Sequence, residues 1–178
     1  RQVVWIREDG KVRLVLYPMK KFGSSIVTDV DIVFPIVHGT NVEDGSLQGF
    51  FHTLDVPFVG CEVLASAVGM DRYVMKTVLK DNDIPVLDCL RFTSADYSDT
   101  DAMIEKIENK MKYPVIVKPV NLGSSVGIKK AHDTASLRDA IDLAFTFASR
   151  ILIEPAIMNL REINCAMLGD FEKAEASE

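Results

Sequence analysis

Hydrophobic residues occur along this chain in short runs separated by polar or glycine- and proline-containing turns, and several runs alternate with segments of helical spacing. Short β-branched runs bounded by turn residues predict strands, whereas apolar residues three or four positions apart predict helices. The predicted strands are residues 2–6, 12–17, 31–37, 56–60, 86–92, 115–117, 128–130, 151–154 and 162–168. The predicted helices are residues 47–54, 64–68, 72–79, 98–111 and 136–145. This alternation predicts a mixed α/β fold.

Turn and capping residues mark the ends of several predicted elements. The pair Asp9 and Gly10 favours a tight hairpin between the first two strands. The segment after the second strand lacks a clear period and is predicted to be a loop. Asp71 is predicted to cap one helix, and Ser98 and Ser136, each followed three residues later by aspartate, are predicted to open the next two.

Composition restricts the class of protein. The chain has 178 residues, 48% of them hydrophobic, which is enough for one good core or two small ones, and we expect two segments that share an interface. A formal net charge of -6 argues against a broad nucleic-acid surface, because phosphate binding of that kind needs a basic face. Since no apolar run approaches the roughly 20 residues needed to cross a bilayer, no membrane association is expected.

Cysteine usage and the N-terminal sequence bear on the compartment. Cys61, Cys89 and Cys165 are far apart and lack C-x-x-C spacing, so neither a disulfide framework nor a zinc site is expected. The opening sequence RQVVWIR lacks the layout of a signal peptide and does not begin with methionine. We therefore expect a cytoplasmic protein of which this chain is a fragment.

Residues 114–128 (PVIVKPVNLGSSVGI) carry the strongest functional signal. Lys118 interrupts a β-branched run, and Pro119 limits how far regular strand pairing continues. Residues 123–127 then supply flexible backbone, free N–H groups and two hydroxyl groups, which together suit a triphosphate. The alternative is a lysine that extends to solvent at the end of a strand, followed by a flexible surface hairpin.

Charged residues at two other places are candidates for ligand binding. His38, Glu43 and Asp44 follow the predicted strand at residues 31–37, where open α/β sheets bind ligands. The alternatives are a hydrogen-bonded turn histidine and an acidic first helical turn. Arg72 lies in the first turn of its predicted helix, where the helix dipole disfavours a cation. A ligand phosphate would explain its position, and a plain surface arginine is the alternative.

Five motifs occur in register: HGxxxEDGxLQG from His38, ASAxxMDR ending at Arg72, YPVIVKP ending at Pro119, GSSVG from Gly123 and ILIE ending at Glu154. Together they resemble the D-alanine:D-alanine ligase family of the ATP-grasp superfamily over residues 31–169, whereas the glycine loop does not match a P-loop. The resemblance implies a partial ATP-grasp fold. Its divisions would be a remnant of a Rossmann-like D-amino-acid-binding domain (1–60), the central ATP-grasp subdomain (61–154) and the start of a truncated C-terminal subdomain (155–178).

The resemblance implies that ATP contacts Arg72, Lys118, Ser125, Glu154, Pro155, Ile157 and Glu162. Lys118 and Arg72 would contact the phosphates, and residues 123–127 would close over the γ-phosphate. Glu154 would accept a hydrogen bond from the adenine amino group, with Pro155 and Ile157 beside the base. Glu162 would bind the ribose hydroxyl groups, a role that suits a carboxylate.

For the amino-acid substrates, the resemblance implies that His38 and Glu43 hold the first D-alanine and that Ser124 acts as the catalytic residue near the ammonium group of the second. The implied reaction is ATP-dependent formation of D-alanyl-D-alanine through an acyl phosphate, for peptidoglycan precursor synthesis. Mg²⁺ or Mn²⁺ would assist, with its ligands outside this chain. A homodimer with D-alanine and ATP as its small-molecule partners is also implied.

Three positions depart from the usual pattern of the family. Val42 stands where glycine is usual, Arg72 where lysine is common and Pro155 where lysine is frequent, which predicts changes in loop shape and in adenine contacts. The opening glycine-rich motif and the magnesium-binding C-terminal segment of the family are absent from this chain, so the chain alone is expected to be inactive. The alternatives are a D-alanine:D-serine or D-alanine:D-lactate ligase and a non-catalytic nucleotide-binding module.

Overall fold

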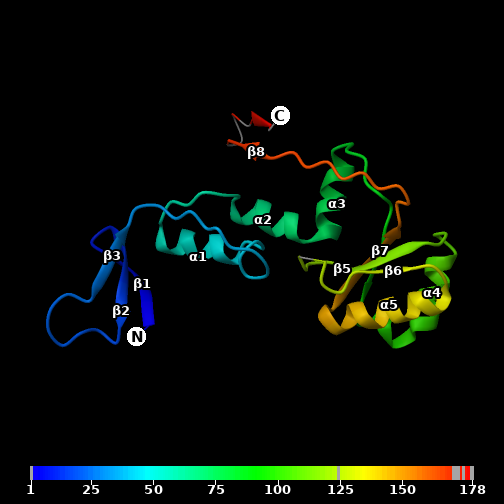
Figure 1. The fold of residues 1–178 in the computed structure, drawn as a ribbon, viewed down its shortest axis with the longest axis horizontal. Helices are drawn as coiled ribbons and strands as arrows, with labels where there is room; N and C mark the ends of the chain where they lie inside the picture. The colour runs from blue at the N-terminus through cyan, green and yellow to red at the C-terminus, as the bar shows by residue number, and fades with distance from the viewer. Residues whose placement is uncertain (1, 124, 170–172, 174, 177–178) are drawn as a thin grey trace.

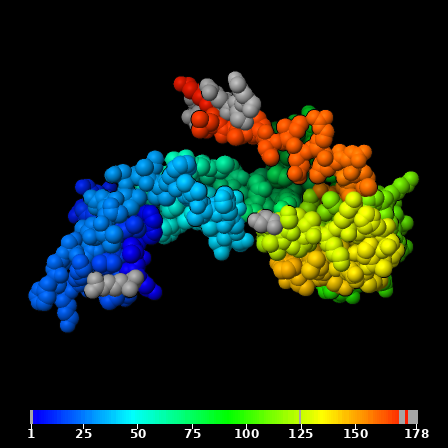
Figure 2. Space-filling model, viewed as in Figure 1, coloured from blue at the N-terminus to red at the C-terminus, as the bar shows by residue number. Residues whose placement is uncertain are grey.

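The computed structural model describes residues 2–123, 125–169, 173 and 175–176, and it is elongated, with a sheet-containing lobe at each end (Figure 1, Figure 2). Its strands are β1 (Gln2–Glu8), β2 (Lys11–Tyr17), β3 (Ile26–Val30), β4 (Leu90–Thr93), β5 (Val115–Pro119), β6 (Lys129–Ala131), β7 (Arg150–Pro155), β8 (Met167–Leu168) and β9 (Glu175–Ala176). Its α-helices are α1 (Ser46–Leu54), α2 (Val63–Met70), α3 (Arg72–Asp81), α4 (Thr100–Glu108) and α5 (Thr134–Phe147). The mixed α/β prediction is therefore confirmed.

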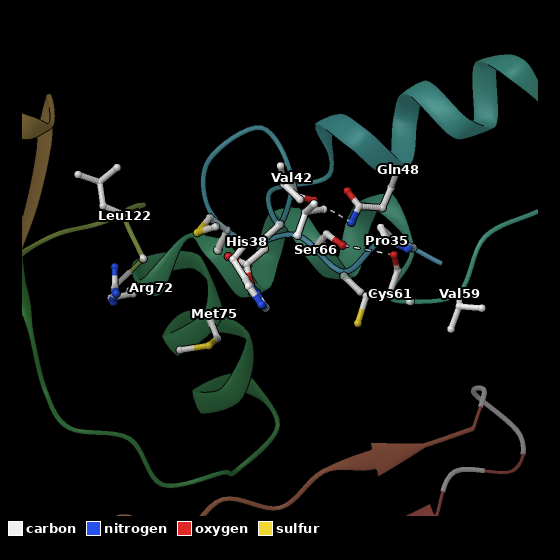
Figure 3. A pocket seen from close by; sticks show the side chains of 17 residues that line it. Pro35, His38, Val42, Gln48, Val59, Cys61, Ser66, Arg72, Met75 and Leu122 are labelled. Carbon is white, nitrogen blue, oxygen red and sulfur yellow. Dashed lines mark hydrogen bonds and ion pairs between the residues drawn. The ribbon is translucent and has the colours of Figure 1, made fainter. Parts of the chain in front are cut away.

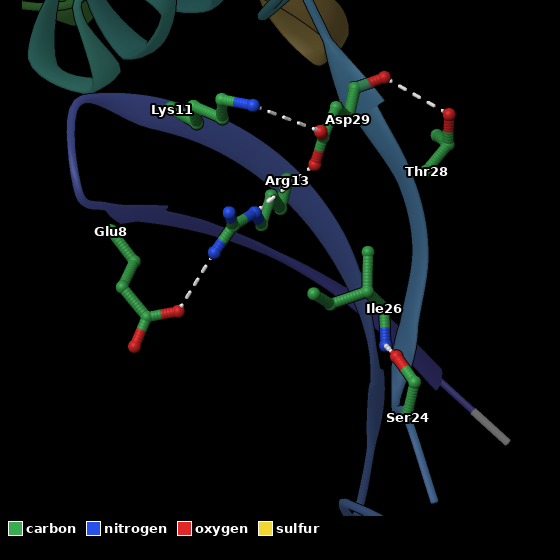
Figure 4. A network of polar contacts seen from close by, with 7 residues as sticks. All are labelled: Glu8, Lys11, Arg13, Ser24, Ile26, Thr28 and Asp29. Atoms are coloured by element: carbon green, nitrogen blue, oxygen red, sulfur yellow. Dashed lines mark hydrogen bonds and ion pairs between the residues drawn. The ribbon is translucent and has the colours of Figure 1, made fainter.

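The N-terminal lobe contains a meander of β1, β2 and β3 in which both neighbouring pairs are antiparallel. Asp9 and Gly10 form the first turn with φ angles of 52° and 74°, the left-handed conformation that a tight hairpin needs, so the predicted hairpin is confirmed. Arg13 on β2 donates hydrogen bonds of 3.0 Å to Glu8 and to Asp29, and it thereby connects all three strands (Figure 4). β3 occupies part of the segment predicted to be a loop.

A small core joins this meander to α1. Val12, Phe51 and Val56 are buried there, and partly buried aromatic residues, including Trp5 and Phe58, pack against them. The rings of Phe51 and Phe58 lie 5.5 Å apart between centroids. This contact fixes α1 beside the segment that follows it.

The predicted strands at residues 31–37 and 56–60 are reduced to one parallel bridge between Val33 and Phe58. Backbone hydrogen bonds of 2.8 and 2.9 Å flank this bridge. The prediction that residues 31–37 form a buried strand is wrong, since Ile36, for example, is 77% exposed. Parallel strands are stable when their neighbours cover both faces, and no other described strand pairs with either segment.

The second lobe contains the principal core. Its sheet has the order β4-β7-β5-β6, every neighbouring pair is antiparallel, and α4 and α5 lie on one face of it (Figure 1). Val115 and Val117 of β5 and Ile151 and Ile153 of β7 belong to the core that these helices cover, and each is at most 1% exposed. Because side chains alternate across a strand, the intervening residues of β5 and β7 lie on the opposite face.

Two of the three predicted helix caps are displaced. Asp71 caps α3 as predicted, because its side chain accepts hydrogen bonds of 3.1 and 3.0 Å from two N–H groups of the first turn. In contrast, α4 is capped by Asp99 instead of Ser98, and α5 by Asp133 instead of Ser136. Ser136 is the third helical residue and completes a capping box with Asp133. Aspartate and serine cap helices almost equally well, so each cluster of such residues allowed two starts.

Two predicted strands are shorter in the structure. β4 begins at Leu90 instead of residue 86, and within residues 162–168 only Met167 and Leu168 are in a strand, β8. Before β4, the carbonyl group of Leu87 accepts a hydrogen bond of 3.0 Å from the side chain of Lys76.

None of the helices in the described part of the chain combines the length and the apolar character that crossing a bilayer requires.

Replacement of Leu137 by alanine is expected to lower the free energy of unfolding by about 2–5 kcal/mol, because its fully buried side chain would leave a cavity between α5 and the sheet. Leu64→Ala is the matched control: this leucine is also helical but is 76% exposed, and a loss below about 0.5 kcal/mol is expected. Urea unfolding measures both. Equal losses would show that the second lobe does not contain the main core.

Candidate functional site

A cavity of about 720 Å³ lies between the two lobes, among α2, α3, the loop before α1 and the segment after β5 (Figure 3). Its wall includes His38, Glu43, Gln48, Ser66, Arg72 and Gly123. The cavity therefore brings together three of the sequence motifs that are far apart along the chain. Both predicted substrate-binding residues, His38 and Glu43, line it with Arg72.

The loop of residues 38–45 is held by its own acidic side chains. Glu43 accepts a hydrogen bond of 2.6 Å from the Gly39 N–H, and its other oxygen lies 3.5 Å from Nδ1 of His38. Asp44 accepts bonds of 2.7 and 3.0 Å from the N–H groups of Asn41 and Ser46. Burial raises the pKa of Asp44, but these hydrogen bonds outweigh it, so the pKa lies below its ordinary value. Both acids thus shape the loop, and Glu43 also lines the cavity.

Val42 does not adopt the positive φ angle that glycine would allow at its position. The left-handed residue of this loop is its neighbour Asn41, with φ of 67°, and asparagine tolerates that conformation well. The Val42 carbonyl accepts a hydrogen bond of 3.0 Å from Nε2 of Gln48, which is 8% exposed and lines the cavity. Strain from a β-branched residue at position 42 is therefore absent, and Gln48 is a structural support that the sequence analysis missed.

Lys76, Lys118 and Glu154 form a buried ion cluster, here called the Lys–Glu cluster, on the sheet face opposite α4 and α5. Nζ of Lys118 donates a hydrogen bond to Oε1 of Glu154, and Nζ of Lys76 lies 3.0 Å from Oε2. The side chains of Lys76, Lys118 and Glu154 are 13%, 16% and 8% exposed. Two ammonium groups thus share one carboxylate in a poorly hydrated place, which leaves an excess of positive charge.

Sequence analysis predicted Lys118 and Glu154 but missed Lys76. The available signal was its spacing: Lys76 follows Arg72 by four residues, which places both side chains on one face of α3. Oε2 of Glu154 is buried and accepts no hydrogen bond from a described residue, although Lys76 lies within ion-pair distance. This oxygen therefore retains a lone pair that a ligand N–H group could use.

Arg72 connects the start of α3 to the end of β5. Its guanidinium group donates hydrogen bonds of 3.1 Å to the Pro119 carbonyl and 3.4 Å to the Val120 carbonyl. Burial lowers the pKa of Arg72 below its ordinary value, and the negative charge of Glu154 opposes this shift. Arg72 is therefore a half-buried residue near the Lys–Glu cluster and not a plain surface arginine, and the carbonyl groups explain a cation in the first helical turn.

The segment after β5 forms consecutive turns. Val126 N–H donates to the Gly123 carbonyl at 3.2 Å, Ile128 N–H donates to the Ser125 carbonyl at 3.3 Å, and Ser125 is left-handed with φ of 59°. Gly127 has φ of 69°, and a Cβ atom there would lie 2.9 Å from both Phe147 and Pro119. The end of the turn thus requires glycine. Ser124, the predicted catalytic residue, lies outside the described residues.

The remaining predicted ATP-binding residues follow Glu154 in the chain. Pro155 ends β7 opposite Val115 and is partly buried, whereas Ile157 is 50% exposed. Glu162 is exposed, in a segment without regular structure. Among the described residues, no hydrogen bond or ion pair joins Glu162 to Lys118 or Glu154, so its role at the ribose stays a prediction. Within the described residues, no group of three or more His, Cys, Asp or Glu side chains could hold a metal ion.

Two family models together match most of this chain. The family model described as D-ala D-ala ligase N-terminus matches residues 8–61, and the one described as D-ala D-ala ligase C-terminus matches residues 78–178. A D-alanine–D-alanine ligase of Acetivibrio thermocellus is 49% identical over 142 residues, which are 79% of this chain and 38% of that protein. The chain thus spans about two fifths of the length of this relative.

Solved structures of ligases have the same fold. The crystal structure of the D-alanine–D-alanine ligase from Helicobacter pylori matches with a TM-score of 0.81 and 26% identity, over 98% of this chain and 50% of that one. The VanG D-Ala:D-Ser ligase from Enterococcus faecalis matches with a TM-score of 0.73 and 32% identity, over 93% and 48% of the two chains. The partial ATP-grasp fold that the motifs predicted is therefore confirmed. The chain belongs to the D-alanine–D-alanine ligase family.

Proposed function

We propose that the intact protein is an ATP-dependent ligase that joins two D-alanine molecules into D-alanyl-D-alanine for peptidoglycan precursor synthesis. One observation carries the proposal: Arg72 lines the cavity that contains His38 and Glu43, while its guanidinium group binds the carbonyl oxygens that follow Lys118 directly. A site for an amino acid and a site for a phosphate chain thus share a wall. That adjacency is what transfer of a phosphoryl group between two substrates requires.

The Lys–Glu cluster supplies the groups that ATP binding needs. Lys118 and Arg72 offer positive charge for the phosphates, and Oε2 of Glu154, which forms an ion pair with Lys76 but accepts no hydrogen bond from a described residue, suits the amino group of adenine. We place Pro155 and Ile157 beside the base, Glu162 at the ribose and Ser125 at the phosphates, on the family resemblance. Residues 123–127 follow the strand that carries Lys118, and Gly123 lines the cavity together with Arg72, so on the family resemblance we propose this segment for the phosphates.

The cavity suits the first amino acid. His38 and Glu43 offer a donor and an acceptor at its wall, which match the carboxylate and ammonium groups of D-alanine. The carboxylate of the first D-alanine would attack the γ-phosphorus of ATP, with ADP as the leaving group. The amine of the second D-alanine would then attack the acyl carbon, release phosphate and lose a proton. We assign Ser124 to orienting that amine.

Further properties of the intact protein stay predictions. A divalent metal, Mg²⁺ or Mn²⁺, would neutralise phosphate charge, and we propose that its ligands lie outside the residues that the structure describes. The division into residues 1–60, 61–154 and 155–178 is proposed, and the family match that ends at residue 61 supports its first boundary. The homodimer is proposed on the family resemblance alone, and the cytoplasmic location on the spacing of the three cysteines.

The intact protein is expected to release phosphate from ATP only when D-alanine is supplied, because phosphoryl transfer needs the carboxylate acceptor. A phosphate-release assay with D-alanine, L-alanine or no amino acid measures this. Mass spectrometry of the product, with D-serine or D-lactate added in parallel, identifies the second substrate; similarity to a D-Ala:D-Ser ligase makes this arm necessary. Turnover without D-alanine would contradict the proposal, and ATP binding without turnover would favour the nucleotide-binding module.

Lys118→Ala is expected to weaken ATP binding by the intact protein by about ten- to a hundredfold, since a charge-assisted hydrogen bond to phosphate contributes about 1.5–3 kcal/mol. Lys129→Ala is the control. Lys129 is on the neighbouring strand β6, its side chain is 40% exposed, and it lies 3.6 Å from Asp139, so a change below about threefold is expected. Isothermal titration compares the two. Equal effects would remove Lys118 from the phosphate site.

A further inference from the structure

Lys118 is already engaged in the Lys–Glu cluster before any phosphate arrives. Its ammonium group donates to Oε1 of Glu154, whose side chain is 8% exposed. To bind a phosphate, Lys118 must give up part of this interaction. Removing one partner from a buried ion pair leaves an uncompensated charge and destabilises the protein strongly. An isolated pair of Lys118 and Glu154 would therefore hold the lysine away from its ligand.

Lys76 changes this balance. Its Nζ lies 3.0 Å from the other carboxylate oxygen of Glu154 and donates a hydrogen bond of 3.0 Å to the Leu87 carbonyl. The second contact fixes the ammonium group between α3 and the segment before β4, independently of Lys118. Burial raises the pKa of the nearby Cys89 thiol, which the charge of Lys76 opposes, so this region is poorly hydrated. Glu154 accordingly retains a cation when Lys118 is drawn elsewhere.

We propose that Lys76 is a positioning residue that allows Lys118 to exchange the Glu154 carboxylate for a phosphate of the nucleotide. The inference rests on the proposed ATP site and deepens it: Lys76 touches no phosphate, and it acts by neutralising the carboxylate that Lys118 leaves. The free site has two ammonium groups, with side chains 13% and 16% exposed, for one carboxylate. One of them can therefore bind a phosphate while the other still neutralises Glu154.

The test is a double-mutant cycle for ATP binding by the intact protein, measured by isothermal titration. Lys76→Gln keeps a donor for the Leu87 carbonyl but removes the charge, and it is expected to raise the Kd for ATP about tenfold or more. In the Glu154→Gln background, Lys118 is not held by a carboxylate, so adding Lys76→Gln is expected to change the Kd by less than about threefold. Lys76→Arg, which retains the charge, is expected to restore binding to within about threefold of wild type.

Lys80→Gln is the matched control, one turn further along α3, with a side chain that is 73% exposed and 3.6 Å from Asp88. It is expected to leave the Kd unchanged. Lys76→Met is measured in parallel and must also weaken ATP binding. Thermal unfolding followed by circular dichroism separates loss of fold from loss of affinity. Equal losses from Lys76→Gln in both backgrounds would mean direct phosphate contact and would overturn the inference, as would an unchanged Kd. Failure of the wild-type protein to bind ATP would instead overturn the proposed function.

Discussion

The antiparallel register of β5 with β7 is the constraint on which the candidate site depends. Ile116 lies opposite Glu154, and Lys118 lies opposite Leu152, so the two charged residues are diagonal neighbours on one face. The opposite face is sealed by α4 and α5. A slip of one residue would turn Lys118 into that core and expose Val117. The same pairing therefore secures the fold and separates the charged face from the hydrophobic one.

The fold of the second lobe was largely predictable because the apolar residues that define its sequence pattern are the residues that its core buries. Val115, Val117, Ile151 and Ile153 read as strands and are core strands. The N-terminal lobe was less predictable: residues 31–37 have the composition of a buried strand, yet composition does not say whether neighbouring elements cover it. Local chemistry also allowed alternatives, as at Asp133 and Ser136, where either residue could have begun the helix.

The candidate site was predictable where a single motif contains the residue and its surroundings. Lys118, Glu154, His38 and Glu43 were nominated in this way, and the structure places His38 and Glu43 at the cavity and Lys118 beside Glu154. The contacts between these residues and others could not be predicted, because they join separate motifs. Lys76 and Glu154 form an ion pair although they are far apart in the sequence, and no local pattern specifies such a contact. Side-chain support within a loop is equally hidden, as the hydrogen bond of Gln48 to Val42 shows.

Arg72 belongs both to the wall of the cavity and to the surroundings of Glu154. An occupant that moves this guanidinium group in either place changes the electric field felt in the other. Thermodynamic linkage then makes the effect mutual, because any gain in affinity that one substrate confers on its partner must be returned by the same factor. In the proposed function, a single arginine at the start of α3 thus couples the occupancy of the amino-acid site to that of the nucleotide site.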